Sequence, residues 1–380
     1  MSELLERLRG DLEALEASHR RRALRRPLGI DCSSNDYLGI GGHPAVRAAI
    51  GAAVADGVPA GSGGSRLLSG NHEQHERAES RFAEYIGRER SLLFGSGYAA
   101  NLALLSALPG RHDLILLDAG AHASLKEGAR ASLATKRTFR HNDAADLAVT
   151  LRDRPAFRDV FVVAEGVYSM DGDRAPLGAL ARVAGEHDAH LIVDEAHATG
   201  LYGARLRGVH ELEGVTPLAT VHPCGKALGS SGAFIAADAP VIDYLINHAR
   251  PFLFSTAPPP IQVAGLIAAL ELLPSMTDRA AELLALAARF RARLEGLSRW
   301  RIISSDSPII PIITGSDQSA VRAAAMVQEH GFDLRPIRPP TVPAGTSRLR
   351  VSLTIGISGG DCDRLAAVIL AAERKLEEIA

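Results

Sequence analysis

The order of apolar and polar positions predicts alternating strands and helices over the middle of the chain. Short apolar runs that stop at polar residues are typical of buried strands, and they occur at residues 92–94, 114–117, 161–164 and 191–193. Apolar residues at helical spacing lie between them, for example at 98–108 and 177–187. This alternation over about 90–240 predicts a large α/β domain with a doubly wound, mostly parallel sheet.

The pattern differs on both sides of this region. Five leucines at helical spacing predict an amphipathic helix over 3–17. Beyond the Pro-rich segment at 250–260, the pattern predicts a helical region at 261–297, strands at 301–303, 308–313 and 348–354, and helices at 318–330 and 361–378. We therefore expect an N-terminal helix and arm at 1–45, a large domain at 46–245 and a smaller α+β domain at 246–380.

Composition narrows the range of partners. The 42 basic residues nearly balance the 44 acidic residues, and aromatic residues make up only 4% of the 380, so neither nucleic acid nor an anionic membrane is an expected partner. Three scattered cysteines without CxxC spacing argue against a disulfide framework or a zinc site and favour a reducing compartment. Because no apolar run reaches about 18 residues, we expect a cytoplasmic protein without a membrane span.

The segment from Asp194 to Lys226 holds the main candidate chemistry. Asp194 follows an apolar run, which predicts a carboxylate at the carboxyl end of a strand, where open α/β sheets bind their ligands. His197 follows closely, and Lys226 lies between glycine and alanine. This set suits pyridoxal phosphate, because a lysine forms a Schiff base with its aldehyde and an acid pairs with its ring nitrogen.

A second candidate feature is the turn at residues 95–97 (Gly-Ser-Gly) between a predicted strand and a predicted helix. Glycines allow close approach of an anion, and the free N–H groups at a helix start face it. The same turn, with Asp118 further on, also resembles a dinucleotide-binding fingerprint. That interpretation leaves the residues of the 194–226 segment without a role, so we favour a phosphate site.

Three other motifs have weaker interpretations. The run Asp-Glu-Ala-His at 194–197 matches a helicase motif, but no phosphate-binding GxxxxGK[ST] loop accompanies it. The GxSxG run at 356–360 is not followed by any histidine, as a hydrolase triad in that order requires, so it is predicted to be a loop. His72 and His75 lack metal-site spacing, and a structural or surface role is expected for them; no metal site is predicted.

Several motifs in order give the chain a resemblance to a known family. SSNDYLG, GSGGSRLLSGNHEQHERAE, FGSGYAAN, EGVYSMDGD, VDEAHATG, GKALGSSGA and RPPTVPAGTSRLR are similar to those of the α-oxoamine synthases, which are fold-type I pyridoxal phosphate enzymes. Within this family the match is nearest to the synthase of biotin biosynthesis. The similarity extends from about residue 23 to the last predicted helix.

The resemblance implies a role for each matching residue. Lys226 corresponds to the Schiff-base lysine, Asp194 to the partner of the ring nitrogen, His197 to the partner of the ring oxygen and His122 to the residue stacked on the ring. Further cofactor contacts implied by the resemblance are Gly97, Tyr98, Glu165, Ser169 and, from a neighbouring subunit, Ser255 and Thr256. Substrate contacts implied by it are Arg25, Asn35, His122, Thr341 and Arg350, and the amino-acid carboxylate falls to Arg350.

The resemblance also implies an activity and an assembly. A homodimer with active sites at its interface is expected to condense an amino acid with an acyl-CoA thioester and release CO₂. L-alanine with a pimeloyl thioester, carried by CoA or a carrier protein, is the expected pair. Alternatives are glycine with acetyl-CoA or succinyl-CoA, serine with a long-chain acyl thioester, and a non-catalytic partner subunit.

The chain departs from the family pattern in two places. Pro223 occupies the position three residues before the lysine, where the family has a threonine that donates to the phosphate. Near the N-terminus, Arg26 is followed almost directly by Ile30, so that a hairpin-sized piece of the family is short or missing. The first departure affects how the phosphate is held, and the second affects the assignment of Arg25.

Overall fold

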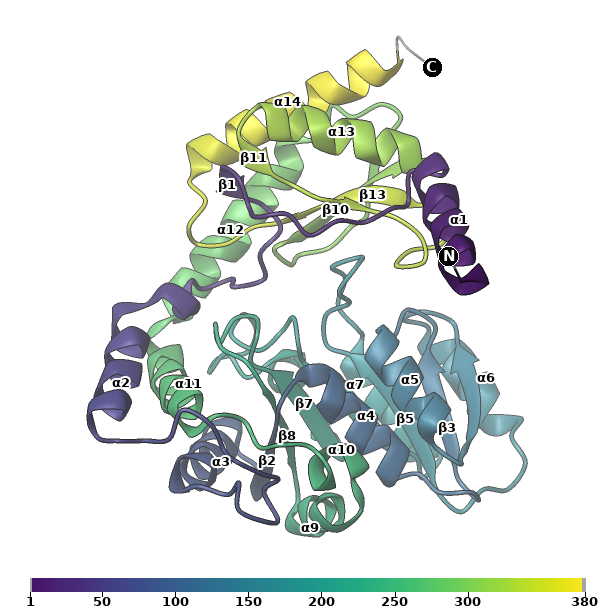
Figure 1. The fold of residues 1–380 in the computed structure, drawn as a ribbon. Coiled ribbons are helices and arrows are strands. Elements are labelled where there is room, and N and C mark those ends of the chain that lie inside the picture. The colour runs from purple at the N-terminus through teal and green to yellow at the C-terminus, as the bar shows by residue number, and fades with distance from the viewer. Residues whose placement is uncertain (1, 378–380) are drawn as a thin grey trace. The chain divides into compact units, whose positions relative to one another are not determined.

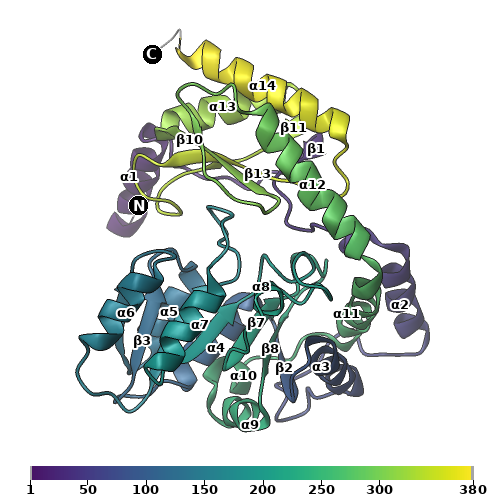
Figure 2. The same ribbon diagram turned by 180° about the vertical axis from the view of Figure 1, so that it is seen from behind.

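A computed structural model describes residues 2–377, which form two compact units (Figures 1 and 2). The large unit contains residues 36–169 and 174–281, and the small unit contains the residues up to 35, 170–173 and those from 282 onward. Helix α12 (Thr277–Arg293) begins in the large unit and continues into the small one. The predicted division of the chain at residues 45 and 245 stays a prediction.

A seven-stranded sheet forms the centre of the large unit. Its strands lie in the order β2-β8-β7-β6-β5-β3-β4, and only β8 runs antiparallel to both of its neighbours. Their bounds are β2 (Arg90–Phe94), β3 (Leu114–Asp118), β4 (Thr135–Phe139), β5 (Val160–Glu165), β6 (His190–Asp194), β7 (Ala219–Pro223) and β8 (Ala233–Ala237). The predicted mostly parallel α/β sheet is confirmed.

Helices cover both faces of this sheet, because its central strands are apolar on both sides (Figures 1 and 2). On one face, strand residues such as Ile115 and Ile235 pack into a core with α4 (Gly97–Ala107), α5 (Ala123–Ala131) and α9 (Ala239–His248). On the other face, Phe82 of α3 (Glu73–Ile86) stacks on Phe234 of β8 with ring centroids 4.2 Å apart.

The remaining elements of the large unit are short or peripheral. They are η1 (Ile40–Gly42), α2 (Pro44–Ala55), α6 (Ala144–Arg152), α7 (Leu177–Glu186), α8 (Val209–Leu212), α10 (Arg250–Leu253), α11 (Pro260–Leu272) and η2 (Leu273–Ser275). His72 caps α3 and forms a capping box with His75, whose Nε2 lies 2.7 Å from the carbonyl oxygen of Pro258. The structural role predicted for these two histidines is confirmed.

The small unit is built on a four-stranded antiparallel sheet in the order β12-β13-β10-β9, with α13 and α14 packed together over it (Figure 1). A parallel pair, β1-β11, joins the N-terminal arm to this unit. The bounds are α1 (Glu3–Ala17), β1 (Ile30–Asp31), β9 (Arg301–Ile302), β10 (Ile309–Gly315), α13 (Asp317–Glu329), β11 (Phe332–Asp333), β12 (Pro336–Ile337), β13 (Ser347–Ser352) and α14 (Gly359–Glu377).

The predicted elements agree with these bounds except in one helical region. The segment predicted as helical over 261–297 is interrupted at η2, and the helices on either side are bent by 74°. Pro274 lies within η2, and proline inside a helix lacks the N–H and clashes with the preceding turn. Within residues 2–377 no single helix is long and apolar enough to cross a membrane, and this bent pair meets the criteria only when both helices are taken together.

Candidate active site

Two acidic side chains meet at the carboxyl ends of neighbouring parallel strands in the large unit. Glu165 ends β5, Asp194 ends β6, and the two residues are paired in the register of the sheet. Both are almost fully buried. The sequence places each acid at the end of an apolar run, and the parallel pairing then brings them to one edge of the sheet.

A chain of hydrogen bonds links Asp194 to His122. Oδ2 of Asp194 accepts from Nδ2 of Asn101 at 2.6 Å, and the same Nδ2 lies 2.9 Å from Oγ of Ser124. That hydroxyl is 2.8 Å from Nδ1 of His122, which also caps α5 by accepting from the backbone N–H of Ser124. Asp194 and His122, far apart in sequence, are therefore held in one network by α4 and α5.

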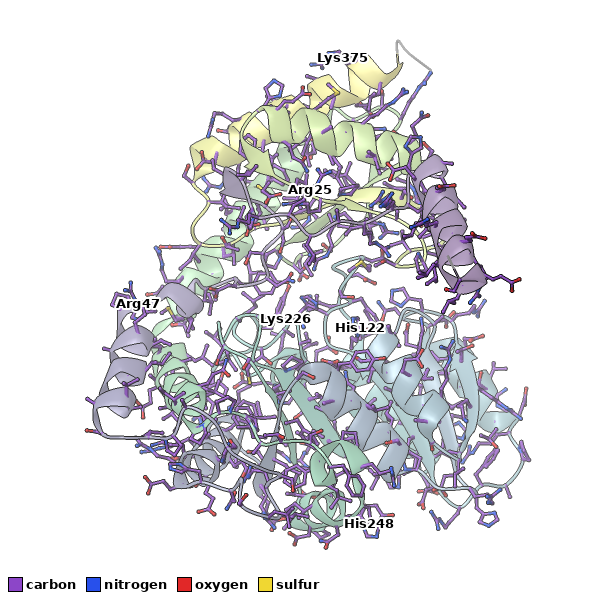
Figure 3. The ribbon with its side chains drawn as sticks, viewed as in Figure 1. Arg25, Arg47, His122, Lys226, His248 and Lys375 are labelled. Atoms are coloured by element: carbon purple, nitrogen blue, oxygen red, sulfur yellow. The ribbon has the colours of Figure 1, made fainter. Side chains whose placement is uncertain are left out.

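Lys226 belongs to the same electrostatic group. Its charge and that of Asp194 both act on Glu165 and on His122. Burial raises the pKa of Glu165 well above its ordinary value, and Asp194 raises it further, while the His122 N–H that donates at 2.5 Å opposes them. Desolvation lowers the pKa of His122, Asp194 opposes this, and Lys226 adds to it. Figure 3 shows His122 and Lys226 at the same end of the large unit.

His197 is fixed by a residue that sequence reasoning did not assign. Its Nδ1 lies 2.7 Å from the hydroxyl of Tyr37, and both residues are buried. Tyr37 belongs to the SSNDYLG segment, which was expected to contribute only Asn35. This hydrogen bond fixes the orientation of the imidazole. Because Nδ1 is held by Tyr37, the position of Nε2 is fixed as well.

The start of α4 is packed against the strand that leads to Lys226. Ser96 caps the helix by accepting from the N–H of Ala99 at 3.1 Å. A Cβ atom on Gly97 would lie 2.6 Å from Cγ of Pro223, so only glycine fits beside that proline. The departure from the family pattern at 223 therefore has a structural counterpart: the proline ring fills the space next to the helix start.

The segment with Ser255 and Thr256 is exposed in the single chain. Directly after it, the N–H of Ala257 donates to the carbonyl of Gly64, and the Ser62 hydroxyl donates to the carbonyl of Pro258 at 2.7 Å. The Gly/Ser-rich loop at 61–70 thus anchors this segment to the large unit. The contact of Ser255 and Thr256 with a neighbouring subunit stays a prediction.

In the small unit, two predicted substrate residues are in direct contact. Nη2 of Arg350, in the middle of β13, donates to Oδ1 of Asn35 at 3.2 Å, and Arg350 is almost fully buried. Arg25 and Thr341 are both exposed, and the hydroxyl of Thr341 lies 3.3 Å from Nη2 of Arg22. The roles predicted for these four residues stay predictions.

The residues Asn101, Ser124 and Tyr37 were missed by sequence reasoning. Asn101 ends the FGSGYAAN motif, and Ser124 follows His122 by two positions, so both were adjacent to predicted residues. A polar residue on the buried side of an otherwise apolar helix, as Asn101 is in α4, was the available signal. Its partner Asp194 could not have been identified without the tertiary structure.

The donor set of the large unit fits pyridoxal phosphate. Next to Asp194, the buried Oδ1 of Asn101 has no hydrogen-bond partner among residues 2–377. The network therefore has an acceptor that a bound group could use. A buried acid, an amine, two imidazoles and the free N–H groups of α4 match the ring nitrogen, aldehyde, ring face, ring oxygen and phosphate of this group.

Comparison with known proteins identifies the family. Residues 29–369 match the family of class I and II aminotransferases. The chain belongs to this family. The α-oxoamine synthase resemblance, the fold class and the prediction that the chain is an enzyme are confirmed by the relatives described next.

Relatives at higher identity are 8-amino-7-oxononanoate synthases. Those of Anaeromyxobacter dehalogenans and Methylobacterium radiotolerans are each 42% identical to this chain, over 95% of it and 94% and 96% of their own lengths. Among solved structures, a serine palmitoyltransferase of Sphingomonas wittichii has a TM-score of 0.91 at 31% identity, covering 99% of this chain and 98% of that one. The 8-amino-7-oxononanoate synthase of Francisella tularensis has a TM-score of 0.78 at 28% identity, covering 92% and 99%.

Proposed function

We propose that this protein is a pyridoxal phosphate-dependent acyltransferase that condenses L-alanine with a pimeloyl thioester to give 8-amino-7-oxononanoate. CO₂ and the thiol of the donor are the other products, and biotin biosynthesis is the corresponding pathway. The observation that carries the proposal is the hydrogen-bonded chain from Asp194 through Asn101 and Ser124 to His122, with Lys226 beside it. The names of the 42%-identical relatives support the choice of substrates.

Each residue of the large unit has a defined task in this proposal. When bound, pyridoxal phosphate supplies an electron sink for negative charge at the α-carbon of the amino acid. Asp194 would pair with the ring nitrogen, and Nδ2 of Asn101, which donates to this carboxylate at 2.6 Å, holds it in place. His122 would cover the ring face, His197 would pair with the ring oxygen, and the N–H groups of Gly97 and Tyr98 would bind the phosphate, with Ser169 and Glu165 as supporting residues.

Lys226 has two tasks. Its Nζ would hold the cofactor, and the same amine would serve as the base toward the α-proton of the bound amino acid. A positioned base of this kind typically contributes about 10²–10⁴-fold to the rate.

The small unit and a second subunit complete the proposal. Arg350 binds the carboxylate of the amino acid through its guanidinium, which Asn35 orients at 3.2 Å, while Arg25 and Thr341 contact the acyl substrate. Ser255 and Thr256 reach the phosphate of the neighbouring subunit, so we propose a cytoplasmic homodimer. Neither nucleic acid nor a membrane is among the proposed partners.

The first test is the position of covalent attachment. After reconstitution with pyridoxal phosphate and borohydride reduction, peptide mass spectrometry is expected to find the added mass on Lys226. Lys226→Ala should lose both the added mass and product formation, whereas Lys136→Ala, which removes an exposed lysine of β4, should keep both. The proposal is wrong if the Lys226→Ala protein retains the modification.

A second candidate is condensation of serine with a long-chain acyl thioester. The TM-score of 0.91 to a serine palmitoyltransferase is the observation that favours it. Incubating the protein with alanine, glycine or serine and a panel of acyl-CoAs, then weighing the product by mass spectrometry, separates the candidates. We expect the alanine–pimeloyl product; a long-chain serine product would replace our first candidate with the second.

A further inference from the structure

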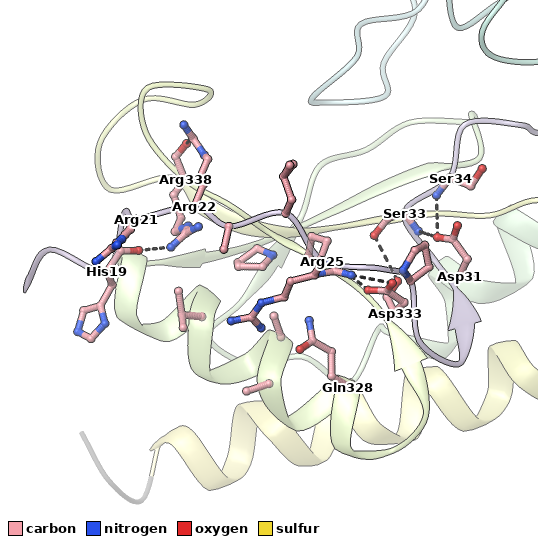
Figure 4. Close-up of a pocket in the computed structure, with 18 of the residues that line it drawn as sticks. His19, Arg21, Arg22, Arg25, Asp31, Ser33, Ser34, Gln328, Asp333 and Arg338 are labelled. Atoms are coloured by element: carbon pink, nitrogen blue, oxygen red, sulfur yellow. Dashed lines mark hydrogen bonds and ion pairs between the residues drawn. The ribbon is translucent and has the colours of Figure 1, made fainter. Parts of the chain in front are cut away.

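A basic pocket lies entirely within the small unit, between the N-terminal arm and α13 (Figure 4). The cavity has a volume of about 940 Å³. Five arginines line it: Arg21, Arg22, Arg25, Arg335 and Arg338. Three acidic residues line it as well: Glu16, Asp31 and Asp333. Positive charge is therefore in excess.

The acidic residues neutralise only two of these arginines. Nε of Arg335 lies 2.6 Å from Oδ1 of Asp333, and Nη1 of Arg21 lies 3.6 Å from Oε2 of Glu16. Asp31 accepts instead from the backbone N–H groups of Ser33 and Ser34. Arg22, Arg25 and Arg338 therefore have no carboxylate in contact among the residues that the structure describes.

These three arginines have unused donors. Arg22 makes only long contacts of 3.3–3.5 Å, to two carbonyl oxygens and the Thr341 hydroxyl. Arg338 donates to the carbonyl of His19, but its Nε is buried without a hydrogen-bond partner within residues 2–377. For Arg25 the described part of the chain provides neither a hydrogen bond nor an ion pair; Figure 4 shows its side chain extending over the helix that carries Gln328.

The arginines of this pocket lie close enough to act on one another. Burial lowers the pKa of the Arg338 guanidinium, and the positive charge of Arg22 lowers it further, while Asp317 opposes the shift. That aspartate is already engaged by Arg20 at 2.6 Å. Repulsion between guanidinium groups is relieved when an anion binds between them, and a guanidinium matches phosphate oxygens in a bidentate geometry.

The opposite wall of the pocket has a different character. Val321, Ala324 and Ala325 of α13 contribute small apolar side chains, and Gln328 adds an amide at the end of this row. An apolar surface with one amide, next to several arginines, suits a flat heterocyclic base attached to phosphates. Inorganic phosphate alone would leave this wall unused.

We propose that this pocket binds a nucleotide polyphosphate, with its phosphates on Arg22, Arg25 and Arg338 and its base on the apolar wall of α13. The ligand has two sources with the same chemistry. One is the 3′-phosphoadenosine diphosphate end of an acyl-CoA, which rests on the proposed function and would make CoA, rather than a carrier protein, the acyl carrier. The other is a free adenine nucleotide, which is independent of that function.

Calorimetric titration of the protein reconstituted with pyridoxal phosphate tests the proposal, using 3′,5′-ADP, CoA and ATP as probes and inorganic phosphate for comparison. We expect saturable binding that weakens with salt. The double variant Arg22→Gln/Arg25→Gln should raise the Kd at least tenfold, which corresponds to about 1.4 kcal/mol. Arg322→Gln is the matched control, because Arg322 is an exposed arginine of α13 outside the pocket lining.

Each outcome has a defined meaning. Binding of CoA and 3′,5′-ADP but not ATP supports the acyl-CoA source, and equal binding of ATP supports the free nucleotide. The proposal is overturned if none of the three probes saturates, or if the double variant and Arg322→Gln bind alike. Arg25→Gln alone serves if the double variant fails to fold, since Arg25 makes no polar contact that it would lose. Product formation without nucleotide binding would support the proposed function and refute the nucleotide site. Nucleotide binding without any product would support the nucleotide site and refute the proposed function.

Discussion

At the scale of single residues, Asn101 connects Asp194 at the end of β6 to His122 at the start of α5. Its Nδ2 reaches both Oδ2 of Asp194 and Oγ of Ser124, which in turn contacts His122. A hydrogen bond to a charged group contributes about 1.5–3 kcal/mol, and a buried carboxylate that loses its donor also loses the contact that orients it. Asn101 is thus expected to set the position of the Asp194 carboxylate.

Asn101→Ala should therefore weaken cofactor binding by about 10–100-fold, from the free energy of one charged hydrogen bond. The measurement is the Kd of pyridoxal phosphate, from the change in visible absorbance on titration. Asn247→Ala is the control, because this asparagine is exposed and its Nδ2 donates to the carbonyl of Asp243 within the same helix. An unchanged Kd in Asn101→Ala would show that Asp194 does not depend on its donor.

The candidate site residues stand out in the sequence because each lies at the end of a strand or beside small residues. Asp194, Glu165 and Lys226 share that property. Asn101 and Tyr37 could not be predicted, because their importance comes from partners 93 and 160 positions away, and these contacts form only in the tertiary structure.

At the scale of elements, the start of α4 and the end of β7 fit together through Gly97 and Pro223. A methyl group on Gly97 would lie 2.6 and 2.8 Å from two carbons of the proline ring, which cannot move aside as a flexible side chain could. Overpacking of this kind typically costs about 1–3 kcal/mol. The strand that leads to Lys226 would be displaced with the helix start.

Gly97→Ala is expected to lower the melting temperature and to weaken retention of pyridoxal phosphate, as measured by thermal unfolding and by absorbance after dialysis. Gly95→Ala provides the control, because a methyl group there meets no atom within 4 Å. Combining Gly97→Ala with Pro223→Ala should restore part of the loss. If Gly97→Ala and Gly95→Ala have the same melting temperature, the contact between residue 97 and Pro223 has no energetic importance.

Secondary structure was predicted best where apolar side chains are large. Strands β3, β5 and β6 and helices α4 and α7 were predicted from periodicity, whereas β4, β7 and β8 and helices α5 and α6 were not. β4 has the sequence TKRTF and four exposed residues out of five, and β8 is rich in alanine. Neither gives the strong apolar run that identifies a buried strand, so pairing with neighbouring strands decides their structure.

At the scale of the whole molecule, His222 makes stability depend on pH. It is fully buried, with Nδ1 2.8 Å from the Thr199 hydroxyl and Nε2 2.7 Å from the Thr220 hydroxyl. Thr199 donates its proton to the Glu195 carbonyl, so Nδ1 must donate to Thr199 and Nε2 must accept from Thr220, as in a neutral ring. Burial lowers the pKa of His222 well below its ordinary value, and the charge of His210 adds to this.

The direction of the pH effect follows from proton uptake. Below the ordinary histidine pKa of about 6.5 the unfolded chain binds a proton at this residue and the folded chain does not, so stability falls as the pH decreases. The limiting slope is about 1.4 kcal/mol per pH unit. We expect His222→Gln to have a smaller drop in melting temperature between about pH 7 and 5.5 than the unaltered protein.

The control for this prediction is His112→Gln, which removes an exposed histidine from the turn before β3. It should leave the pH dependence unchanged. Parallel curves for His222→Gln and the unaltered protein would mean that other groups determine the effect. If His222→Gln lowers the melting temperature equally at every pH, the loss reflects only the missing hydrogen bonds. The predicted effect differs because it changes the slope of melting temperature against pH.

The position of β2 in the large sheet has a consequence for folding of the chain during its synthesis on the ribosome. β2 is the first strand of that sheet to be synthesised, yet it lies at the edge, and within residues 2–377 its only partner strand is β8. Until residues 233–237 have emerged, the apolar run Leu92–Phe94 has no strand to pair with. A nascent chain that stalls before that point exposes an unpaired, aggregation-prone strand edge. We therefore expect such a chain to be bound by chaperones.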